Sequence, residues 1–248
     1  MNELTDQLER YEQEVIALRR DFHRHPELGF EEHRTAQVIE AYLRDLGLET
    51  QRVAGTGVVA VLRGRCPEPV LMLRADMDAL PITEENEIDY KSQNEGVMHA
   101  CGHDAHMAML LVAAKILVQH KDALDGTIKF VFQPNEEIAG APQMIEEGVL
   151  ENPRVDAVMG IHVWAPVAAG RIAITAGPVM GGLDVFKLTI SGKGGHTGVP
   201  EDAIDPVLCA ANLIQTVQMV QTREISNLKA TIIMFGKVCG GTKSNIIP

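Results

Sequence analysis

Short apolar segments alternate with helical segments between residues 1 and 161, and this alternation limits the folds that are open to the chain. The apolar segments are rich in Val, as buried strands are, whereas the segments between them repeat apolar residues at helical spacing. Strands are expected at 57–63, 70–73, 127–132 and 155–161, and helices at 4–22, 32–46, 105–119 and 141–147. Strands that alternate with helices predict an α/β fold with a mainly parallel sheet flanked by helices.

Polar side chains follow three of these strands directly. Asp76 and Asp78 follow the second strand, Glu136 and Glu137 follow the third, and His162 follows the fourth. Ligands bind at the carboxyl ends of the strands in sheets of this kind, so we expect these side chains to share one rim. A solvated acidic pair, or carboxylates that cap a turn or a helix, is the alternative interpretation for each acidic pair taken alone.

The stretch from Met98 to His106 combines three histidines, a cysteine and an aspartate. Cys101 and His103 flank a glycine, so they can converge on one point only in a turn, and this turn precedes the helix at 105–119. A thiolate and a neutral imidazole are good ligands for first-row divalent metals, and a helix N-terminus favours the thiolate. The cluster therefore predicts a metal site. A buried cysteine with surface histidines is the alternative for any single residue.

Two metal ions at this rim would also explain the adjacent carboxylates. Two divalent ions roughly 3.5–4 Å apart can clamp an attacked carbonyl and lower the pKa of a shared water. On an irregular turn, Glu136 and Glu137 can divide the roles of base and ligand between them. His23 and His25 are interpreted as polar residues at a helix end, with a role near the site as the weaker alternative.

The pattern changes after Gly177, which predicts a second small domain. The pattern in this part predicts a strand at 183–190, a Gly-rich loop at 191–196, a helix at 206–220 and a strand at 228–235. The Gly-rich loop lacks the spacing of a phosphate-binding loop. We expect the chain to divide into domains at 1–181 and 182–248.

Charge and cysteine content exclude several classes of partner. The net charge is -12 and the sequence pI is about 5.2, which argues against nucleic acid or an anionic membrane as a partner.

The N-terminus has no apolar core of a signal peptide, and the longest apolar run, 107–118, is too short to span a bilayer. The four cysteines form no disulfide framework, so a reducing, cytoplasmic location is expected.

Taken together, these residues resemble the M20 metallopeptidases, and within them the amidohydrolase branch of hippurate hydrolases, N-acyl-amino-acid deacylases, N-acetyldiaminopimelate deacetylases and auxin-conjugate hydrolases. The matching segments, in the family's order, are RRDFHRHPELGFEE, LRADMDALPI, MHACGHDAHMAMLL, FQPNEE, GIHVW, GKGGHTGVPEDAIDP and SNIIP. The resemblance implies a zinc-exopeptidase-like catalytic domain over 1–181 and a smaller α+β lid or dimerisation domain over 182–248.

The resemblance also implies two divalent metal ions, zinc or manganese. The metal ligands that it assigns to this sequence are Cys101, His103, Glu137 and His162. Glu136 matches the general base and acid, and Asp78 matches an aspartate that orients the site. Other branches of the superfamily carry a metal-binding histidine where this chain has Asp76, and His103 is expected to take over that role.

Two residues of the second domain match positions that act on the substrate. His196 matches a lid histidine that, in a homodimer, reaches the partner's site and polarises the scissile carbonyl. Asn245 matches a residue that helps to hold the substrate carboxylate or the oxyanion. Asn135 departs from the family pattern, which has Ala or Gly before the Glu pair, and we expect this change to be harmless.

The implied reaction is cleavage of the amide bond of an N-acyl amino acid by attack of a metal-bound hydroxide. Relatives of this kind are longer and supply a final metal-binding histidine, whereas this sequence stops at Pro248. We therefore expect a C-terminally truncated chain in which both domains are incomplete. One alternative is a catalytically impaired fragment that dimerises or binds metal weakly. The other is a thiol amidase with Cys101 as nucleophile and Glu137 or His103 as its partner.

Overall fold

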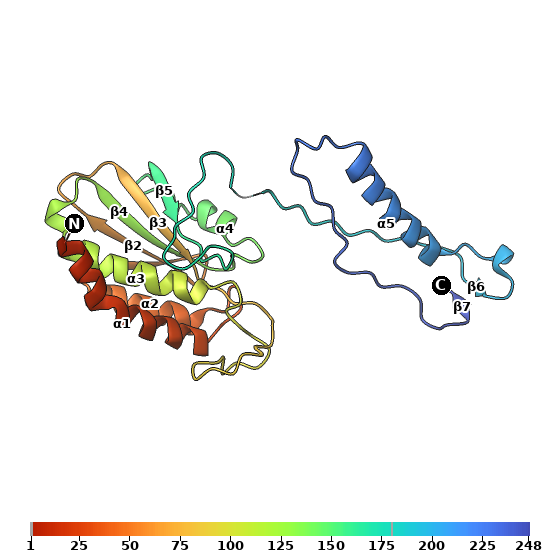
Figure 1. The fold of residues 1–248 in the computed structure, drawn as a ribbon, viewed down its shortest axis with the longest axis horizontal. Helices are drawn as coiled ribbons and strands as arrows, with labels where there is room; N and C mark the ends of the chain where they lie inside the picture. The colour runs from red at the N-terminus through yellow and green to blue at the C-terminus, as the bar shows by residue number, and fades with distance from the viewer. Residues whose placement is uncertain (1, 180) are drawn as a thin grey trace. The chain divides into compact units, whose positions relative to one another are not determined.

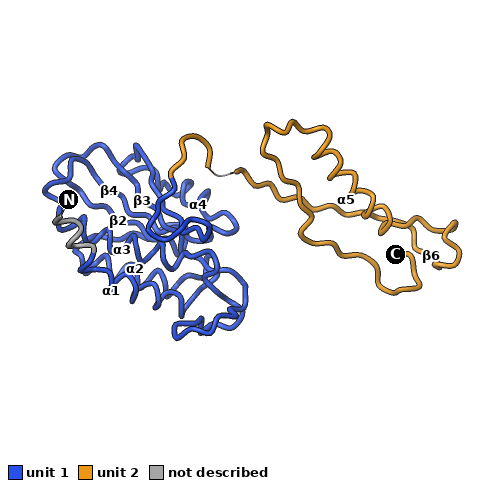
Figure 2. The backbone as a smooth tube through the Cα atoms, in the orientation of Figure 1, with its two compact units in different colours: residues 1–173 blue, residues 174–248 orange. Residues whose placement is uncertain are grey.

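The computed structural model describes residues 2–179 and 181–248, with side chains in the first helix described from residue 9 onward. The chain divides into two compact units, residues 1–173 and 174–248 (Figure 2). The boundary falls ahead of the domain division expected at 181/182, which stays a prediction.

A five-stranded sheet forms the centre of the first unit (Figure 1). Its strands are β1 (Thr50–Val53), β2 (Gly57–Arg63), β4 (Thr127–Gln133), β3 (Val70–Asp76) and β5 (Ala157–Gly160), in that spatial order. The pairs β4/β3 and β3/β5 are parallel, whereas β1/β2 and β2/β4 are antiparallel. The expected α/β architecture is confirmed. The sheet is mixed, because it contains both parallel and antiparallel strand pairs. Its antiparallel part begins with a hairpin whose turn residues Ala54 and Gly55 have positive φ.

Helices cover both faces of this sheet. Three helices, α1 (Asn2–Arg24), α2 (His33–Asp45) and α3 (His103–Gln119), pack on one face (Figure 1). The short helix α4 (Ala141–Glu146) contributes Met144 to the core on the other face. Successive strand residues point to opposite faces, so Phe130 and Phe132 join the first core and Val131 joins the second.

Among its described residues, the second unit contains the long helix α5 (Pro206–Arg223) and a short 3-10 turn at Pro200–Asp202. Asp205 caps α5, because its carboxylate accepts hydrogen bonds from the Val207 and Leu208 amides. Two short strands, β6 (Gly195–His196) and β7 (Ile246–Ile247), pair antiparallel.

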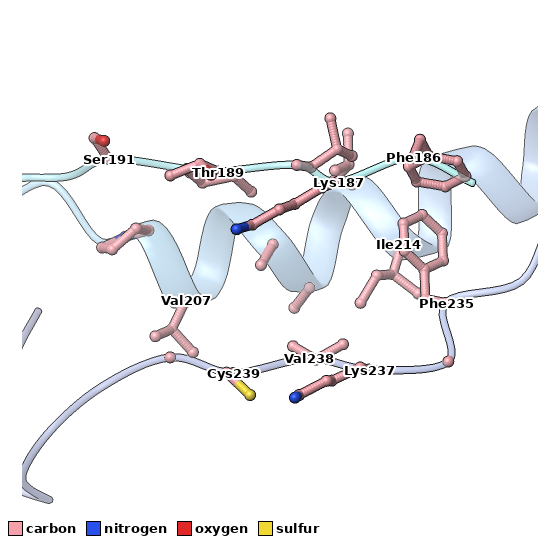
Figure 3. A pocket seen from close by; sticks show the side chains of 18 of the residues that line it. Phe186, Lys187, Thr189, Ser191, Val207, Ile214, Phe235, Lys237, Val238 and Cys239 are labelled. Atoms are coloured by element: carbon pink, nitrogen blue, oxygen red, sulfur yellow. The ribbon is translucent and has the colours of Figure 1, made fainter. Parts of the chain in front are cut away.

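The prediction of strands at 183–190 and 228–235 is wrong, because neither segment makes a sheet ladder within the described residues. A strand needs a neighbour at hydrogen-bonding distance, whereas residues 183–190 and the end of the second segment, Met234 and Phe235, line a hollow beside α5 (Figure 3). They meet through the rings of Phe186 and Phe235, whose centroids lie 5.6 Å apart. Many of their apolar side chains are exposed, among them Leu183 and Leu228.

Over the described residues, none of the helices combines the length and the apolar character that a membrane crossing requires.

Replacement of Leu111 by Ala tests the core between α3 and the sheet. Leu111 is fully buried in this core, so the substitution should lower the free energy of unfolding of the first unit by about 2–5 kcal/mol. Urea unfolding followed by hydrogen exchange of the α3 amides measures the change. The matched control is Leu183→Ala, at an exposed position, which should change stability by less than about 0.5 kcal/mol. Equal effects of the two substitutions would contradict this core assignment.

Candidate metal centre

Gly102 makes the turn that places Cys101 and His103 at the start of α3. Its φ of 88° lies in the left-handed region, and it caps the helix. A Cβ atom at this position would lie 2.3 Å from Cγ2 of Val163. Glycine therefore serves both the turn and the close approach of the segment that carries His162.

His103 presents one ring nitrogen to the site. Its Nδ1 donates a hydrogen bond to the Asp78 carbonyl oxygen at 2.8 Å. Its Nε2 is buried and has no hydrogen-bond partner among the described residues. It faces carboxylate oxygens of Asp76, Glu136 and Glu137 at 3.6, 3.7 and 3.9 Å. A neutral imidazole with this orientation offers Nε2 as a metal ligand.

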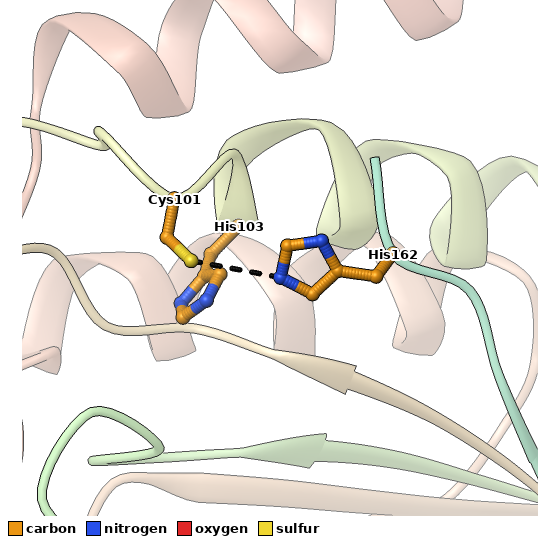
Figure 4. Close-up of side chains that lie close together, drawn as sticks. All are labelled: Cys101, His103 and His162. Carbon is orange, nitrogen blue, oxygen red and sulfur yellow. Dashed lines mark hydrogen bonds between the residues drawn. The ribbon is translucent and has the colours of Figure 1, made fainter. Parts of the chain in front are cut away.

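His162 approaches the same point from the end of β5. Its Nδ1 donates to the Val163 carbonyl oxygen at 2.6 Å, so its Nε2 is the nitrogen left for a ligand. This Nε2 lies 3.5 Å from Sγ of Cys101. Figure 4 shows the two side chains pointing toward each other beside His103. Three potential ligands from two segments thus face one another.

The turn after β4 brings Glu136 and Glu137 to this point. The Glu137 amide donates to Oδ2 of Asp78 at 3.0 Å. Oε1 of Glu137 is buried, and no described residue forms a hydrogen bond with it. Glu136 is the more exposed of the two, with 36% of its side chain accessible. The adjacent carboxylates therefore occupy different environments, as a division of roles requires.

A buried carboxylate fixes this turn from behind. Glu32 accepts a hydrogen bond from the Asn135 amide at 2.9 Å and another from Oγ1 of Thr56 at 2.5 Å. Burial raises the pKa of Glu32, in spite of these hydrogen bonds. Asn135 has a φ of 50°, a conformation that asparagine tolerates better than most residues. A Cβ on Gly29 would overlap the Asn135 side chain.

Asp76 and Asp78 have separate partners, although Asp76 is the last residue of β3 and Asp78 follows it closely. Asp76 accepts hydrogen bonds from His106 Nδ1 and from Arg74, both at 2.6 Å. Burial acts to raise the pKa of Asp76, but the His106 hydrogen bond and the charges of His103 and Arg74 outweigh it and lower the pKa to about 2. Burial likewise acts to raise the pKa of Asp78, but hydrogen bonds from His103 and from the Glu137 backbone outweigh it, so the pKa is lowered.

The donor set fits a divalent metal ion. Single ligand atoms of Cys101, His103 and His162 lie within 4.8 Å of one another, and so do those of His103, Glu136 and Glu137. Buried polar atoms normally have hydrogen-bond partners, yet within the described part of the chain His103 Nε2 and Glu137 Oε1 have none. Thiolate, imidazole and carboxylate are ligands that zinc accepts, and a cation would satisfy both orphaned atoms.

The environment of Cys101 argues against a thiol nucleophile. Burial raises the pKa of this thiol to about 12, and the negative charges of Glu137, Glu136 and Asp76 add to the rise. A nucleophilic cysteine needs the opposite, a lowered pKa beside positive charge. A bound cation would supply that charge and stabilise the thiolate as a ligand.

The sequence-based interpretation missed several buried residues beside the site. His23 is buried and bonded to Asp104 at 2.8 Å and to Glu84 at 3.1 Å, so its interpretation as a polar residue of a helix end is incomplete. The Asp104 hydrogen bond raises the pKa of His23. Burial lowers the pKa of His99 to about 4. The crowding of histidines in 99–106 was the only signal for such a network.

The two predicted substrate-binding residues of the second unit lie close together there. His196 pairs with Ile246 in the β6/β7 ladder, next to Asn245. The Nδ1 of His196 accepts a hydrogen bond from the Gly198 amide at 2.9 Å. The Asn245 carbonyl oxygen accepts one from Thr197. Their roles toward a substrate stay predictions.

Comparison with known proteins identifies the family. The model of peptidase family M20/M25/M40 matches residues 72–247, which is most of the chain. The chain therefore belongs to this family, and the resemblance drawn from the motifs is confirmed.

Individual relatives agree with this assignment. An N-acyl-L-amino acid amidohydrolase of Geobacillus stearothermophilus is 44% identical over 95% of this chain. An N-acetylcysteine deacetylase of Bacillus subtilis is 42% identical over 94% of it. A dinuclear metal-binding M20 peptidase of Bacillus subtilis aligns with a TM-score of 0.70 at 36% identity, covering 85% of this chain and 57% of that one. The chain spans 64% and 62% of the lengths of the first two relatives.

Alkylation of the metal-free protein tests the state of Cys101. A thiol with a pKa near 12 is almost fully protonated at neutral pH, so Cys101 should react with iodoacetamide at least about tenfold more slowly than an ordinary exposed thiol. Exposed Cys66 is the internal control. Peptide mapping by mass spectrometry after chelator treatment gives both rates. Faster alkylation of Cys101 would revive the thiol amidase alternative.

Proposed function

We propose that this chain carries the metal ligands and the base of an amidohydrolase that cleaves the amide bond of N-acyl amino acids. The observation that supports this most is the convergence of buried, unpartnered His103 Nε2 and Glu137 Oε1 beside Cys101 and His162. Relatives named for N-acyl-L-amino acids and for N-acetylcysteine share more than 40% identity with the chain.

The proposed ligands are Sγ of Cys101, Nε2 of His103, a carboxylate oxygen of Glu137 and Nε2 of His162. We infer that the complete site takes two divalent ions, zinc or manganese. Such ions, when bound, polarise an amide carbonyl and lower the pKa of water. Asp78 supports this set from behind, through the hydrogen bond to the Glu137 amide and the contact with His103.

Glu136 is the proposed general base and acid. Its carboxylate is partly exposed and lies at the same rim as the ligands, 3.7 Å from Nε2 of His103. The carboxylate takes a proton from the water molecule that attacks the amide carbonyl. The protonated side chain then delivers that proton to the leaving amine nitrogen.

The second unit is the proposed lid and dimerisation domain. His196 and Asn245, which lie on and beside the paired strands β6 and β7, are proposed to stabilise the oxyanion and to hold the substrate of a partner chain in a homodimer. A cytoplasmic location fits the four free cysteines.

Paired substitutions of the adjacent carboxylates test the division of roles. Glu136→Gln should keep the metal affinity of the unaltered protein and lower hydrolysis of N-acetyl and N-benzoyl amino acids by about 10²–10⁴-fold, because the base is removed and the ligands remain. Glu137→Gln should weaken metal binding at least about tenfold, because a ligand is lost. Calorimetric titration with Mn²⁺ or Zn²⁺ and an assay of released amine give the two quantities.

Glu146→Gln, at an exposed position of α4, is the matched control and should change neither quantity. Activity of Glu136→Gln within a few-fold of the unaltered protein would refute the assignment of the base. Metal binding without hydrolysis in the unaltered chain would favour the alternative of a catalytically impaired fragment. A chain that binds no metal would overturn the proposed site.

A further inference from the structure

His106 lies next to the candidate metal centre, yet both of its ring nitrogens are already engaged. Its Nδ1 lies 2.6 Å from Oδ1 of Asp76, and its Nε2 lies 2.9 Å from the backbone nitrogen of Val163. The residue is 3% exposed. This histidine is therefore surrounded by fixed partners on both sides.

The two contacts determine where the ring proton resides. The Val163 amide can only donate a hydrogen bond, so Nε2 of His106 must accept it and carry no proton. Nδ1 then carries the proton and donates it to the Asp76 carboxylate. His106 has no lone pair left for a cation, although its spacing to Asp76 and His103 is that of a metal-binding group.

The contact with Val163 bears directly on His162, the preceding residue. The Val163 amide is held by His106, and the Val163 carbonyl accepts from Nδ1 of His162 at 2.6 Å. The side chain of Val163 also lies against Gly102, where no Cβ would fit. Gly102, which caps α3, and His106 in the first turn of that helix therefore both contact Val163, the residue beside His162.

We infer that His106 is a positioning residue that aims Nε2 of His162 at the metal centre through the Val163 amide. The chain of contacts runs from Asp76 to His106, then to Val163 and His162, and each link is a hydrogen bond or a peptide bond. This inference rests on the proposed function, because His162 must bind a metal for its orientation to matter. Ring centroids of His106 and His162 only 4.5 Å apart agree with this coupling.

Two substitutions separate the two halves of the His106 side chain. Asn places an amide N–H where Nδ1 lies, so His106→Asn keeps the donor to Asp76 and loses the acceptor for Val163. Gln is one methylene longer and places a carbonyl oxygen where Nε2 lies, so His106→Gln keeps the acceptor for Val163. The two variants have similar polarity and differ in which partner they retain.

Hydrogen exchange at the Val163 amide is the first measurement. Exchange should be at least about tenfold faster in His106→Asn than in the unaltered protein, whereas His106→Gln should stay within about threefold, because only Gln restores the acceptor. The second measurement is titration with Co²⁺, for which His106→Asn should bind about 10–100-fold more weakly and His106→Gln should be rescued to within a few-fold. A purely structural role would affect both variants alike and would contradict the inference.

The two measurements separate the failure of this inference from the failure of the proposed function. If the unaltered protein binds no Co²⁺, the metal site is wrong. If the two variants show the same exchange rate at Val163 or the same Co²⁺ affinity, the role of His106 is wrong. If neither variant folds, hydrogen exchange in the unaltered protein tests the role of His106. Its Val163 amide should exchange at least about tenfold more slowly than the Trp164 amide, and equal rates would overturn the inference.

Discussion

Electrostatic repulsion among carboxylates at one rim of the sheet is the constraint on which the site depends. Asp76, Asp78, Glu136 and Glu137 all lie around the ring of His103. Arg74 and His106 compensate Asp76, and the Glu137 amide compensates Asp78. Among the described residues, the only ion-pair contacts of the Glu136 and Glu137 side chains are the longer ones with His103 Nε2, at 3.7 and 3.9 Å. A bound cation would stabilise this cluster of carboxylates, imidazoles and a thiol, because it would offset the negative charge and give the unpartnered buried atoms a partner.

The rest of the first unit serves to hold this rim in place. Parallel pairing of β3 with β4 sets Asp76 opposite Gln133, so the segments that follow both strands leave the sheet at the same edge. Gly102 lets the start of α3 approach the segment after β5, and Glu32 fixes the turn before the glutamate pair. Catalytic residues in such folds come from several strand ends, which is why the scaffold must be rigid behind them.

The sequence predicted the parts of this arrangement that follow from local patterns. Strand β2 was predicted to the residue, and α3 and α4 to within two residues at either end, because apolar periodicity and glycine stops mark them. The grouping of the candidate ligands was predicted because these residues follow strands or open a helix, and their role in binding metal stays a prediction. Both strand predictions in the second unit were wrong, since an apolar alternating segment shows the propensity of a strand and says nothing of whether a partner lies beside it.

The buried residues behind the candidate ligands could not be predicted in the same way. The burial of His23, and the hydrogen bond of His106 to the Val163 amide 57 residues away, depend on tertiary packing. Nothing in the local sequence distinguishes His106, which supports the centre, from His103, which faces into it. In the structure, both ring nitrogens of His106 form hydrogen bonds within the protein, whereas only Nδ1 of His103 does so among the described residues.

Anomalous diffraction from crystals grown with zinc tests the central claim most directly. An ion bonded to Sγ of Cys101, Nε2 of His103 and Nε2 of His162, at about 2.0–2.3 Å from each, is the result that this account predicts. Zinc bound elsewhere, with the side chains of Cys101, His103 and His162 unliganded, would contradict it.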